Sequence, residues 1–527
     1  MENIFNSVRV EVPPYSTFDL THTHRLSMKM GNIVPFLFEE TVPGDRWKIK
    51  TDILTRFAPL STPVMEMFDI KVEYFNVPYR LLWQSFEEWI VGELQVNPPS
   101  MTNVSDGGVP ILVGSLHDYL GIVPTISYAV EFGNNFNAFG HLAYQKIWFD
   151  WYRDQNHQFP NDRWEKDWII KEGEELINLV TQSARRSQYE PLRVRARDHD
   201  YLTSALPWAQ KGDAILIPFG EFDDVPVRSV EGINQPVILG RTDGVAINSV
   251  ESLNHSNVGV LRDGFDRSLY ITNQEALTSE LAVPSPTINE LRRAEAIQKW
   301  LERNARAGTR YVEHVLANFG KKTKDYRLAR AEMIGAQSMP IIVSEVLQTS
   351  GTADGAGVLG DMGGRAISAS DGQYFTYTAS EHGCIIGNIT VMNKSAYYQG
   401  VNKKFWRKTP FDYVQPLLAQ IGEQPIEIRE VFITGAEDQR ATWGYQSRYA
   451  DWKYGQNQIS GDFRTSLDDW HYAFKMDSVP GLNMGFISWT GDNRIFNVEE
   501  DIDNIYCMLN INLQVERALP FYGTPTN

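Results

Sequence analysis

The chain has 527 residues, of which 42% are hydrophobic and 22% charged, and it contains 14 Trp, 23 Tyr and 26 Phe. This composition excludes a disordered chain, and the length predicts several cores or one core with large insertions. The formal net charge of −17 argues against a protein that simply coats nucleic acid, because neutralising phosphates requires a positive surface.

The two cysteines, Cys384 and Cys507, cannot form a disulfide framework, although the sequence is compatible with one disulfide bond between them. So few thiols in so long a chain fit a reducing cytoplasm. The first residues, MENIFNSVRVEVPPYS, lack the basic start and apolar run of a signal peptide, and no stretch approaches the roughly 18 apolar residues of a membrane span. We therefore expect a soluble protein of the cytoplasm.

Two segments near opposite ends of the chain carry the clearest strand patterns. FDIKVEYFNVP (68–78) and IYCMLNINLQVE (505–516) alternate apolar and polar residues, which is typical of antiparallel strands with one buried face. RWKIKTDILTRF (46–57) alternates more loosely. We expect the strands that contain Val72 and Leu513 to share one core.

Helical patterns occupy the middle of the chain. The segment from Thr287 to Gly308 has a capping box formed by Thr287 and Glu290, an apolar stripe and a glycine stop. Weaker patterns predict helices over 80–91, 138–152 and 311–319.

Residues 211–280 show scattered Gly, Asn, Asp and Pro without a sustained period, so we expect a long irregular loop that is exposed or functional. Strands at both ends, with helices and loops between them, favour a β-sandwich or jelly roll with outgrowths.

Short sequence motifs give only weak signals of cofactor binding or metal binding. GAGVLG (355–360) matches the dinucleotide fingerprint in form, but no strand precedes it and no helix follows, so a glycine-rich loop is the favoured interpretation. His22 and His24 could face one side of a strand, and the acidic cluster from Glu499 to Asp503 could hold a hard cation, yet both lack a full ligand set. We expect no metal, no cofactor and no catalytic residues.

Positive charge is concentrated in two places. Residues 287–330 hold eleven Lys and Arg against five acids. The segment YYQGVNKKFWRKTPFDY interleaves aromatics with cations, and its candidate nucleic-acid-binding residues are Lys403, Lys404, Phe405, Trp406, Arg407 and Lys408. Cations that neutralise phosphates beside aromatics that stack on bases are typical of a sequence-tolerant single-strand binder. An ordinary basic surface over core aromatics remains open.

Several long blocks resemble the major capsid proteins of microviruses, especially the gokushovirus-like branch. They run from FDLTHTHRLSMKMGNIVPFLFEETVPGDRWKIK through ELRRAEAIQKWLERNARAGTRYVEHVLANFG, HGCIIGNITV and YYQGVNKKFWRK to WGYQSRYADWKYGQNQISGDFRTSLDDWH and ERALPFYGTP. The blocks follow the same order as in the family, between about residues 18 and 525. Ordered long blocks are more specific than any short motif above.

The resemblance implies a mainly β fold, an eight-stranded antiparallel viral jelly roll with large helical and loop insertions. We expect one protomer over 1–527, with core strands near 45–78, 383–393 and 503–517 and insertions at 80–210, 211–280 and 287–330. In gokushovirus-like members a variable insertion forms protrusions around the threefold axes, and the position of 211–280 suggests that role for it.

The resemblance also implies a virion protein and not an enzyme. It would form a simple T=1 icosahedral shell of identical copies around circular single-stranded DNA, assembled in the cytoplasm of a host bacterium. The implied partners are this DNA, a small basic DNA-packaging protein and a pilot protein, without a membrane. Two alternatives stay open: a secreted β-sandwich carbohydrate-active enzyme or lectin, which should carry a signal peptide, and a cytoplasmic single-strand-binding protein, which conflicts with the net charge.

Overall fold

The structure is a computed structural model of the whole chain. It describes residues 14–102, 112–124, 135–158, 191–211, 288–307, 310–347 except 323 and 326–328, 362–433, 435, 438–489, 493–499 and 502–522, and short strands between 227 and 276. The chain divides into two compact units, residues 210–303 and the remainder.

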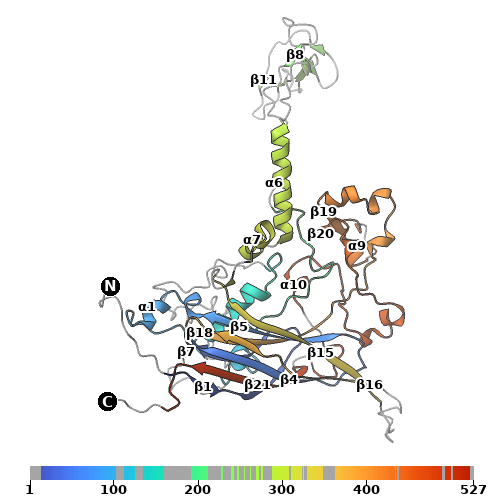
Figure 1. The fold of residues 1–527 in the computed structure, drawn as a ribbon. Helices are drawn as coiled ribbons and strands as arrows, with labels where there is room; N and C mark the ends of the chain where they lie inside the picture. Colours follow the sequence, from blue (N-terminus) through green and yellow to red (C-terminus); the bar gives the residue numbers. More distant parts are fainter. Residues whose placement is uncertain are drawn as a thin grey trace. The chain divides into compact units, whose positions relative to one another are not determined.

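The larger unit is built on one antiparallel sheet (Figure 1). In sheet order its strands are β1 (Ser16–Asp19) with β2 (His22–Met28), β21 (Ile505–Arg517), β4 (Arg46–Phe57), β16 (Met362–Ser370) with β17 (Phe375–Thr378), β15 (Glu332–Leu347), β5 (Phe68–Pro78), β18 (Gly383–Asn393) and β3 (Val34–Thr41). β1 and β2 follow one another along β21, and β16 and β17 follow one another along β4. Ten segments therefore fill eight strand positions, and the predicted mainly β, antiparallel jelly-roll class is confirmed.

The long strand β15 joins the two halves of this sheet. Its first part pairs with β5 and its last part with β16. Side chains from both halves meet in one core, which includes Val72 of β5 and Leu513 of β21, so the expectation that these two residues share a core is confirmed. The Tyr74 hydroxyl donates a hydrogen bond to Thr51 Oγ1 across this core at 2.6 Å. Each fully buried large aliphatic side chain here contributes about 1.5–3 kcal/mol.

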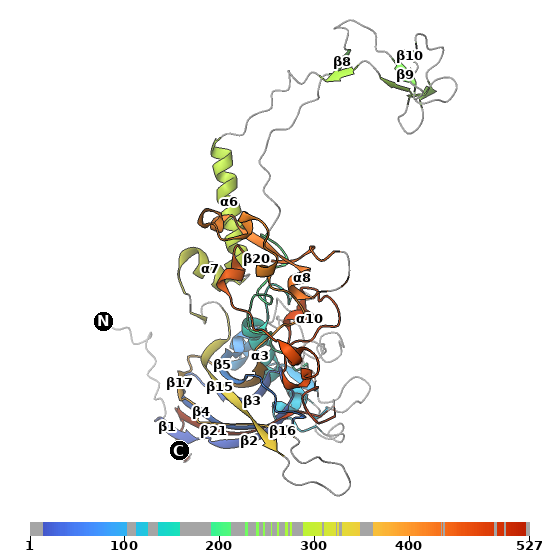
Figure 2. The same cartoon turned by 90° about the vertical axis from the view of Figure 1, so that its right-hand side faces the viewer.

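A second apolar cluster covers the outer face of the sheet over β5 and β18. Helix α3 (Phe139–Ile147) packs there, with Leu142 in contact with the cluster that contains Phe75 and Cys384, and Figure 2 shows α3 beside β5 and β3. β18 is consequently buried at every position, and β5 alternates only in its first half. Two-sided burial removes the polar face that produces a period of two.

One glycine is required by the packing of the sheet. Gly335 follows a β-bulge in β15, and a Cβ built on it would lie 2.1 Å from Cδ1 of Phe375. The aromatic ring occupies the space that any side chain would need.

The inserted helices agree with the sequence pattern in most places. α6 (Ile288–Ala307), α7 (Tyr311–Phe319) and the pair α3 and η2 (Trp148–Tyr152) confirm three predicted helices. The single helix predicted over 80–91 is wrong: η1 (Tyr79–Leu81) and α1 (Phe86–Ile90) are separated by a turn, because Leu82, Trp83 and Phe86 all pack inward in the same cluster. Thr287 and Gly308, the predicted cap and stop of α6, and the glycine motif 355–360 lie outside the described residues.

The segment 211–280 is not wholly irregular, so that prediction is corrected. It contains short antiparallel strands: β8 (Val227–Ser229), β9 (Leu239–Arg241), β10 (Ala246–Ile247), β11 (Asn254–His255), β12 (Leu261–Arg262), β13 (Leu269–Ile271) and β14 (Gln274–Ala276). Strands of two or three residues are too short to produce a visible alternation.

The chain between β18 and β21 folds around a third apolar cluster, which includes Tyr201, Ile426 and Ala450. Its elements are η6 (Lys403–Phe405), η7 (Pro410–Asp412), η8 (Pro416–Gln420), β19 (Glu423–Glu427), α8 (Ile428–Val431), β20 (Thr442–Ser447), α9 (Ala450–Lys453), η9 (Gly461–Arg464), η10 (Asp468–Trp470) and α10 (Met484–Ile487). Three further short elements lie earlier: β6 (Ser100–Thr102), α2 (Leu116–Tyr119) and β7 (Asn135–Asn137). Cys384 and Cys507 are both free and buried, and none of the described helices is long and apolar enough to cross a membrane.

A buried histidine pair under the sheet predicts acid sensitivity. The rings of His117 and His141 lie 4.4 Å apart between centroids, and burial, with the neighbouring His117, lowers the pKa of His141 from 6.5 to about 3. Between these two pH values the unfolded chain binds a proton at His141 that the folded chain does not, so stability falls as the pH falls from 6.5 towards 3.

We therefore expect His141→Leu to remove up to about 1.4 kcal/mol per pH unit from the acid slope of the unfolding free energy. Denaturant unfolding measured at several pH values checks this. Parallel pH profiles for wild type and His141→Leu would contradict the prediction.

Candidate nucleic-acid interface

The six predicted nucleic-acid-binding residues lie on one loop that starts with η6. The side chain of Asn402 accepts a hydrogen bond from the Lys404 amide at 3.0 Å and begins this turn. Lys404, Phe405 and Lys408 are exposed, whereas Lys403, Trp406 and Arg407 are half-buried. The loop therefore divides into residues that face solvent and residues that hold it in place.

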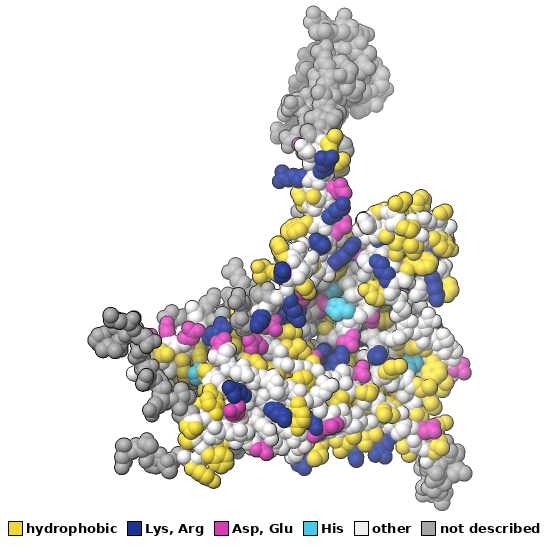
Figure 3. All heavy atoms as spheres, viewed as in Figure 1, with side chains coloured by type: hydrophobic (Ala, Val, Ile, Leu, Met, Phe, Trp, Pro, Cys, Tyr) yellow, Lys and Arg dark blue, Asp and Glu magenta, His cyan; other side chains and the backbone are white. Residues whose placement is uncertain are grey.

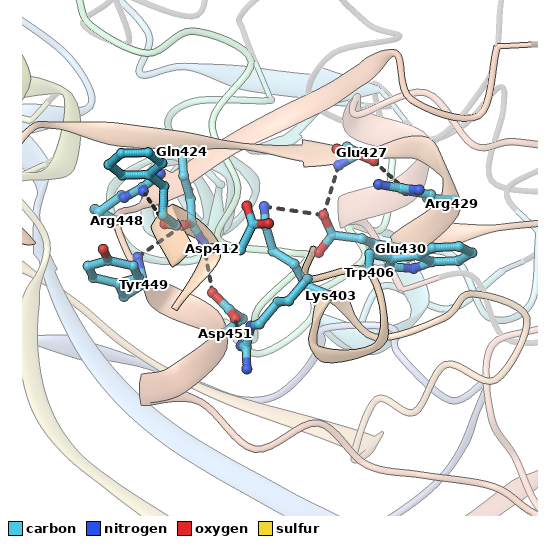
Figure 4. A pocket seen from close by; sticks show the side chains of 12 residues that line it. Lys403, Trp406, Asp412, Gln424, Glu427, Arg429, Glu430, Arg448, Tyr449 and Asp451 are labelled. Carbon is cyan, nitrogen blue, oxygen red and sulfur yellow. Dashed lines mark hydrogen bonds and ion pairs between the residues drawn. The ribbon is translucent and has the colours of Figure 1, made fainter. Parts of the chain in front are cut away.

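Lys403 is neutralised within the chain. Its Nζ donates a hydrogen bond to the Pro425 carbonyl at 2.7 Å and lies 3.5 Å from Glu430 Oε1 (Figure 4). Glu430 also accepts hydrogen bonds from the Tyr201 hydroxyl at 2.9 Å and the Glu427 amide at 3.0 Å. Burial raises the pKa of Glu430, and the charge of Lys403 opposes that rise.

Arg407 forms a buried ion pair with Asp451. The two side chains are only 10% and 5% exposed. Asp451 also accepts a hydrogen bond from Gln424 Nε2 at 3.0 Å, and the guanidinium of Arg407 lies over the Trp452 ring, 4.0 Å from its centroid. This cation is a structural group, because its charge is already matched inside the protein.

Trp406 is likewise engaged. Its Nε1 donates a hydrogen bond to the Val401 carbonyl at 3.0 Å, and the guanidinium of Arg429 covers the ring at 4.2 Å from the centroid. Arg429 is held in turn by an ion pair with Glu427. One face of the indole is thus closed to a base.

The residues that remain available are Lys404, Phe405 and Lys408. Phe405 is 71% exposed, and Lys404 Nζ lies 5.0 Å from the centroid of its ring. Within the described part of the chain, neither lysine forms an ion pair with an acid. A cation beside an exposed aromatic ring, with a second exposed cation on the same loop, can bind phosphates and stack on a base.

A cavity of about 90 Å³ lies behind the loop. Its lining is Lys403, Trp406, Arg407, Phe411, Asp412, Gln424, Glu427, Arg429, Glu430, Arg448, Tyr449 and Asp451. Four cations and four carboxylates are balanced there, and the volume is far below the roughly 300–1,000 Å³ of ordinary ligand pockets. The cavity is therefore an internal polar network and not a phosphate site.

Among the residues that the structure describes, neither metal candidate brings a set of ligands together. Nδ1 of His22 and of His24 are hydrogen-bonded to the carbonyls of Leu20 and Phe36, each at 2.8 Å. Asp503 accepts a hydrogen bond from the Ser27 hydroxyl, while Glu500 and Asp501 lie outside the described residues. Over the described ranges no three His, Cys, Asp or Glu side chains come together as metal ligands would.

Sequence reasoning missed the acids that neutralise the loop. Glu430 and Asp451 lie 27 and 44 positions beyond Lys403 and Arg407, on α8 and α9. No local pattern joins such residues, so counting nearby charges overestimated the free positive charge.

Comparison with known proteins agrees with this architecture. The antiparallel jelly roll is an architecture of viral capsid proteins, and also of lectins and cupins. The chain matches the family model of the capsid protein (F protein) over residues 7–527.

Three relatives named capsid protein VP1 are each 29% identical to the chain. That of Chlamydia phage 1 aligns with 100% of this chain and 98% of its own length, that of Bdellovibrio phage phiMH2K with 90% and 87%, and that of Spiroplasma virus 4 with 97% and 95%. The chain belongs to this capsid protein family, and its role is the structural one of a major capsid protein in the virion. The alternative of a carbohydrate-active enzyme or lectin finds no support.

The buried pair of Arg407 and Asp451 leads to a stability prediction. Asp451→Ala leaves a buried guanidinium without its partner, and we expect a loss of about 3 kcal/mol in the local free energy of unfolding. The double variant Arg407→Met, Asp451→Leu should recover most of that loss, since neither charge remains. Hydrogen exchange of the amides in 442–454 measures both effects.

The exposed pair Lys299–Glu295, whose side chains are 71% and 62% exposed, is the control. Glu295→Ala should leave the free energy of unfolding unchanged within error, because water screens an exposed ion pair. An equal effect of Asp451→Ala and Glu295→Ala would show that the first pair is not structural.

Proposed function

We propose that copies of this chain form a small T=1 icosahedral shell, without catalytic activity, around circular single-stranded DNA in the cytoplasm of a host bacterium. The observation that carries the proposal is the family match over residues 7–527, which includes every strand of the jelly roll and the candidate loop. A small basic DNA-packaging protein and a pilot protein are the proposed partners, and segment 211–280 is the proposed outer-surface insertion.

Microscopy of the purified protein tests the shell. Closed particles of uniform diameter, with icosahedral averages, are expected from the wild-type chain under virion-like conditions. A protein that stays monomeric under these conditions, with or without its partners and DNA, would contradict the proposal.

Within the shell, we propose that Lys404, Phe405 and Lys408 face the interior and contact the genome, while Lys403, Trp406 and Arg407 hold the loop in shape. A protein of net charge −17 repels a dense polyanion, and repulsion is relieved where unpaired cations face the DNA. Sequence preference should be slight, because phosphate contacts carry no code and stacking accepts any base.

Removal of the two free lysines tests this contact. Lys404→Ala with Lys408→Ala should leave shells intact, since neither lysine is in an ion pair with an acid that the structure describes, but these shells should hold less DNA and lose it at lower salt. A plot of the logarithm of the binding constant for single-stranded DNA against the logarithm of the salt concentration has a negative slope. Two lost phosphate contacts should reduce the magnitude of this slope by about 1.4. The ratio of nucleic-acid to protein absorbance in purified particles measures the DNA content, and binding titrations at several salt concentrations measure the slope.

The control removes two exposed lysines elsewhere, Lys321→Ala with Lys322→Ala, and changes the net charge equally. An equal loss of DNA in both variants would show that only total charge matters. Failure of the Lys404 and Lys408 variant to assemble would instead assign these lysines to a contact between subunits.

Phe405 tests the stacking contribution separately. Phe405→Ala should weaken binding of a single-stranded oligonucleotide by about 1–3 kcal/mol per stacked base and leave its salt slope unchanged. Phe405→Tyr, which keeps an aromatic face, should retain most of the affinity. Equal affinities of the alanine variant and wild type would remove Phe405 from the interface.

A further inference from the structure

A run of large apolar side chains is exposed on residues 411–421, named here the apolar loop. Its members are Phe411, Tyr413, Val414, Leu417 and Ile421. Leu417 is 93% exposed, and the others are between 41% and 68% exposed. Figure 3 shows hydrophobic side chains gathered over the part of the molecule that carries β19, β20 and α9 in Figure 1. Contiguous apolar surface of this kind marks an interaction site.

The apolar loop is held firmly from beneath. The Tyr449 hydroxyl donates a hydrogen bond to the Tyr413 carbonyl at 3.2 Å and accepts one from the Gln415 amide at 3.1 Å. Arg448 donates to the Phe411 carbonyl at 3.2 Å. The carboxylate of Asp412 accepts hydrogen bonds from the amides of Lys408 and Thr409, which lower its pKa.

These hydrogen bonds turn backbone groups inward and leave the apolar side chains outside. The loop cannot fold over to bury them without losing its own hydrogen bonds. Tyr449 also adopts a left-handed backbone with φ of 61°, a conformation that a tyrosine keeps only where its surroundings fix it. The loop is therefore preorganised, which lowers the entropic cost of binding a partner.

The apolar surface continues onto α9. The guanidinium of Arg407 lies 5.9 Å from the centroid of Tyr413 and 4.0 Å from that of Trp452, so these two rings are neighbours. Trp452 is 49% exposed. With this ring, the exposed side chains present on the order of 700 Å², close to the roughly 800 Å² that each partner buries in a standard interface.

The chemistry of the loop favours an apolar protein surface over the genome as its occupant. Asp412 is the one charged residue in 411–421, and a carboxylate repels phosphate. Val414, Leu417 and Ile421 have no π face on which a base could stack. An apolar partner of comparable area is required, and a major capsid protein meets copies of itself in the virion.

We infer that the apolar loop, with Trp452, binds a second copy of this chain as a contact between subunits of the shell. This inference rests on the proposed shell-forming function and names one surface that performs it.

Leu417→Gln with Ile421→Gln keeps the side-chain size but removes the apolar surface. We expect about a tenfold rise in the concentration of unassembled protomer, as for the loss of central interface contacts. Leu417→Met with Ile421→Val, which stays apolar, is the matched control and should assemble like wild type. Sedimentation and microscopy measure assembly, and circular dichroism shows that both variants fold.

A labelling experiment identifies the occupant independently of stability. In Leu417→Cys the new thiol is exposed, whereas Cys384 and Cys507 are buried, so a thiol reagent modifies one site. Labelling should be about tenfold slower in empty shells made of this chain alone than in free protomers, because the partner copy excludes solvent.

The outcomes separate this inference from the proposed function. If wild type never forms shells, the proposed function fails and the inference fails with it. If wild type assembles, but the glutamine variant assembles equally well or the thiol introduced by Leu417→Cys stays reactive in empty shells, only the inference fails. Protection that requires DNA or another virion protein would assign the loop to that partner and overturn the inference.

Discussion

The pairing of β21 with β4 is the interaction on which the rest of the structure depends. It joins residues 505–516 to residues 46–57 in a continuous antiparallel register, and β1 and β2 extend it on the other side of β21. Every segment between these strands must leave and re-enter the sheet at fixed points. Large insertions are tolerated under this constraint because loop-closure entropy grows only slowly with length.

Burial of one face or of both faces decides which strands could be predicted from the sequence. β4, β5 and β21 alternate because one face meets the core and the other meets solvent or polar groups for most of their length. β18 gives no such pattern because α3 covers its second face. The last six residues of β15 pair with β16 and contribute little to the core, so burial imposes no period on them. Helices α6 and α7 were predictable because their 3.6-residue pattern is local.

The candidate site was predictable only in its location on the chain. The alternation of cations and aromatics at 403–408 is local, and all six residues do lie on one loop. Their division into free and neutralised groups depends on Glu430 and Asp451, which the fold brings from α8 and α9. The exposed run 411–421 was missed for a related reason: apolar residues are expected in a core, and only the structure shows that these side chains face outward.

The neutralised cations connect the two proposed contact surfaces physically. Asp451, which binds Arg407, also accepts a hydrogen bond from Gln424, and Gln424 Oε1 accepts one from the Tyr449 amide at 3.0 Å. Tyr449 then fixes the apolar loop through its hydroxyl. The ion pair is therefore part of a continuous network that shapes both the exposed cations at 404 and 408 and the apolar loop. For the two proposed contacts, with DNA and with a second copy of the chain, such a rigid base matters because each contact would otherwise have to order the loop separately at its own entropic cost.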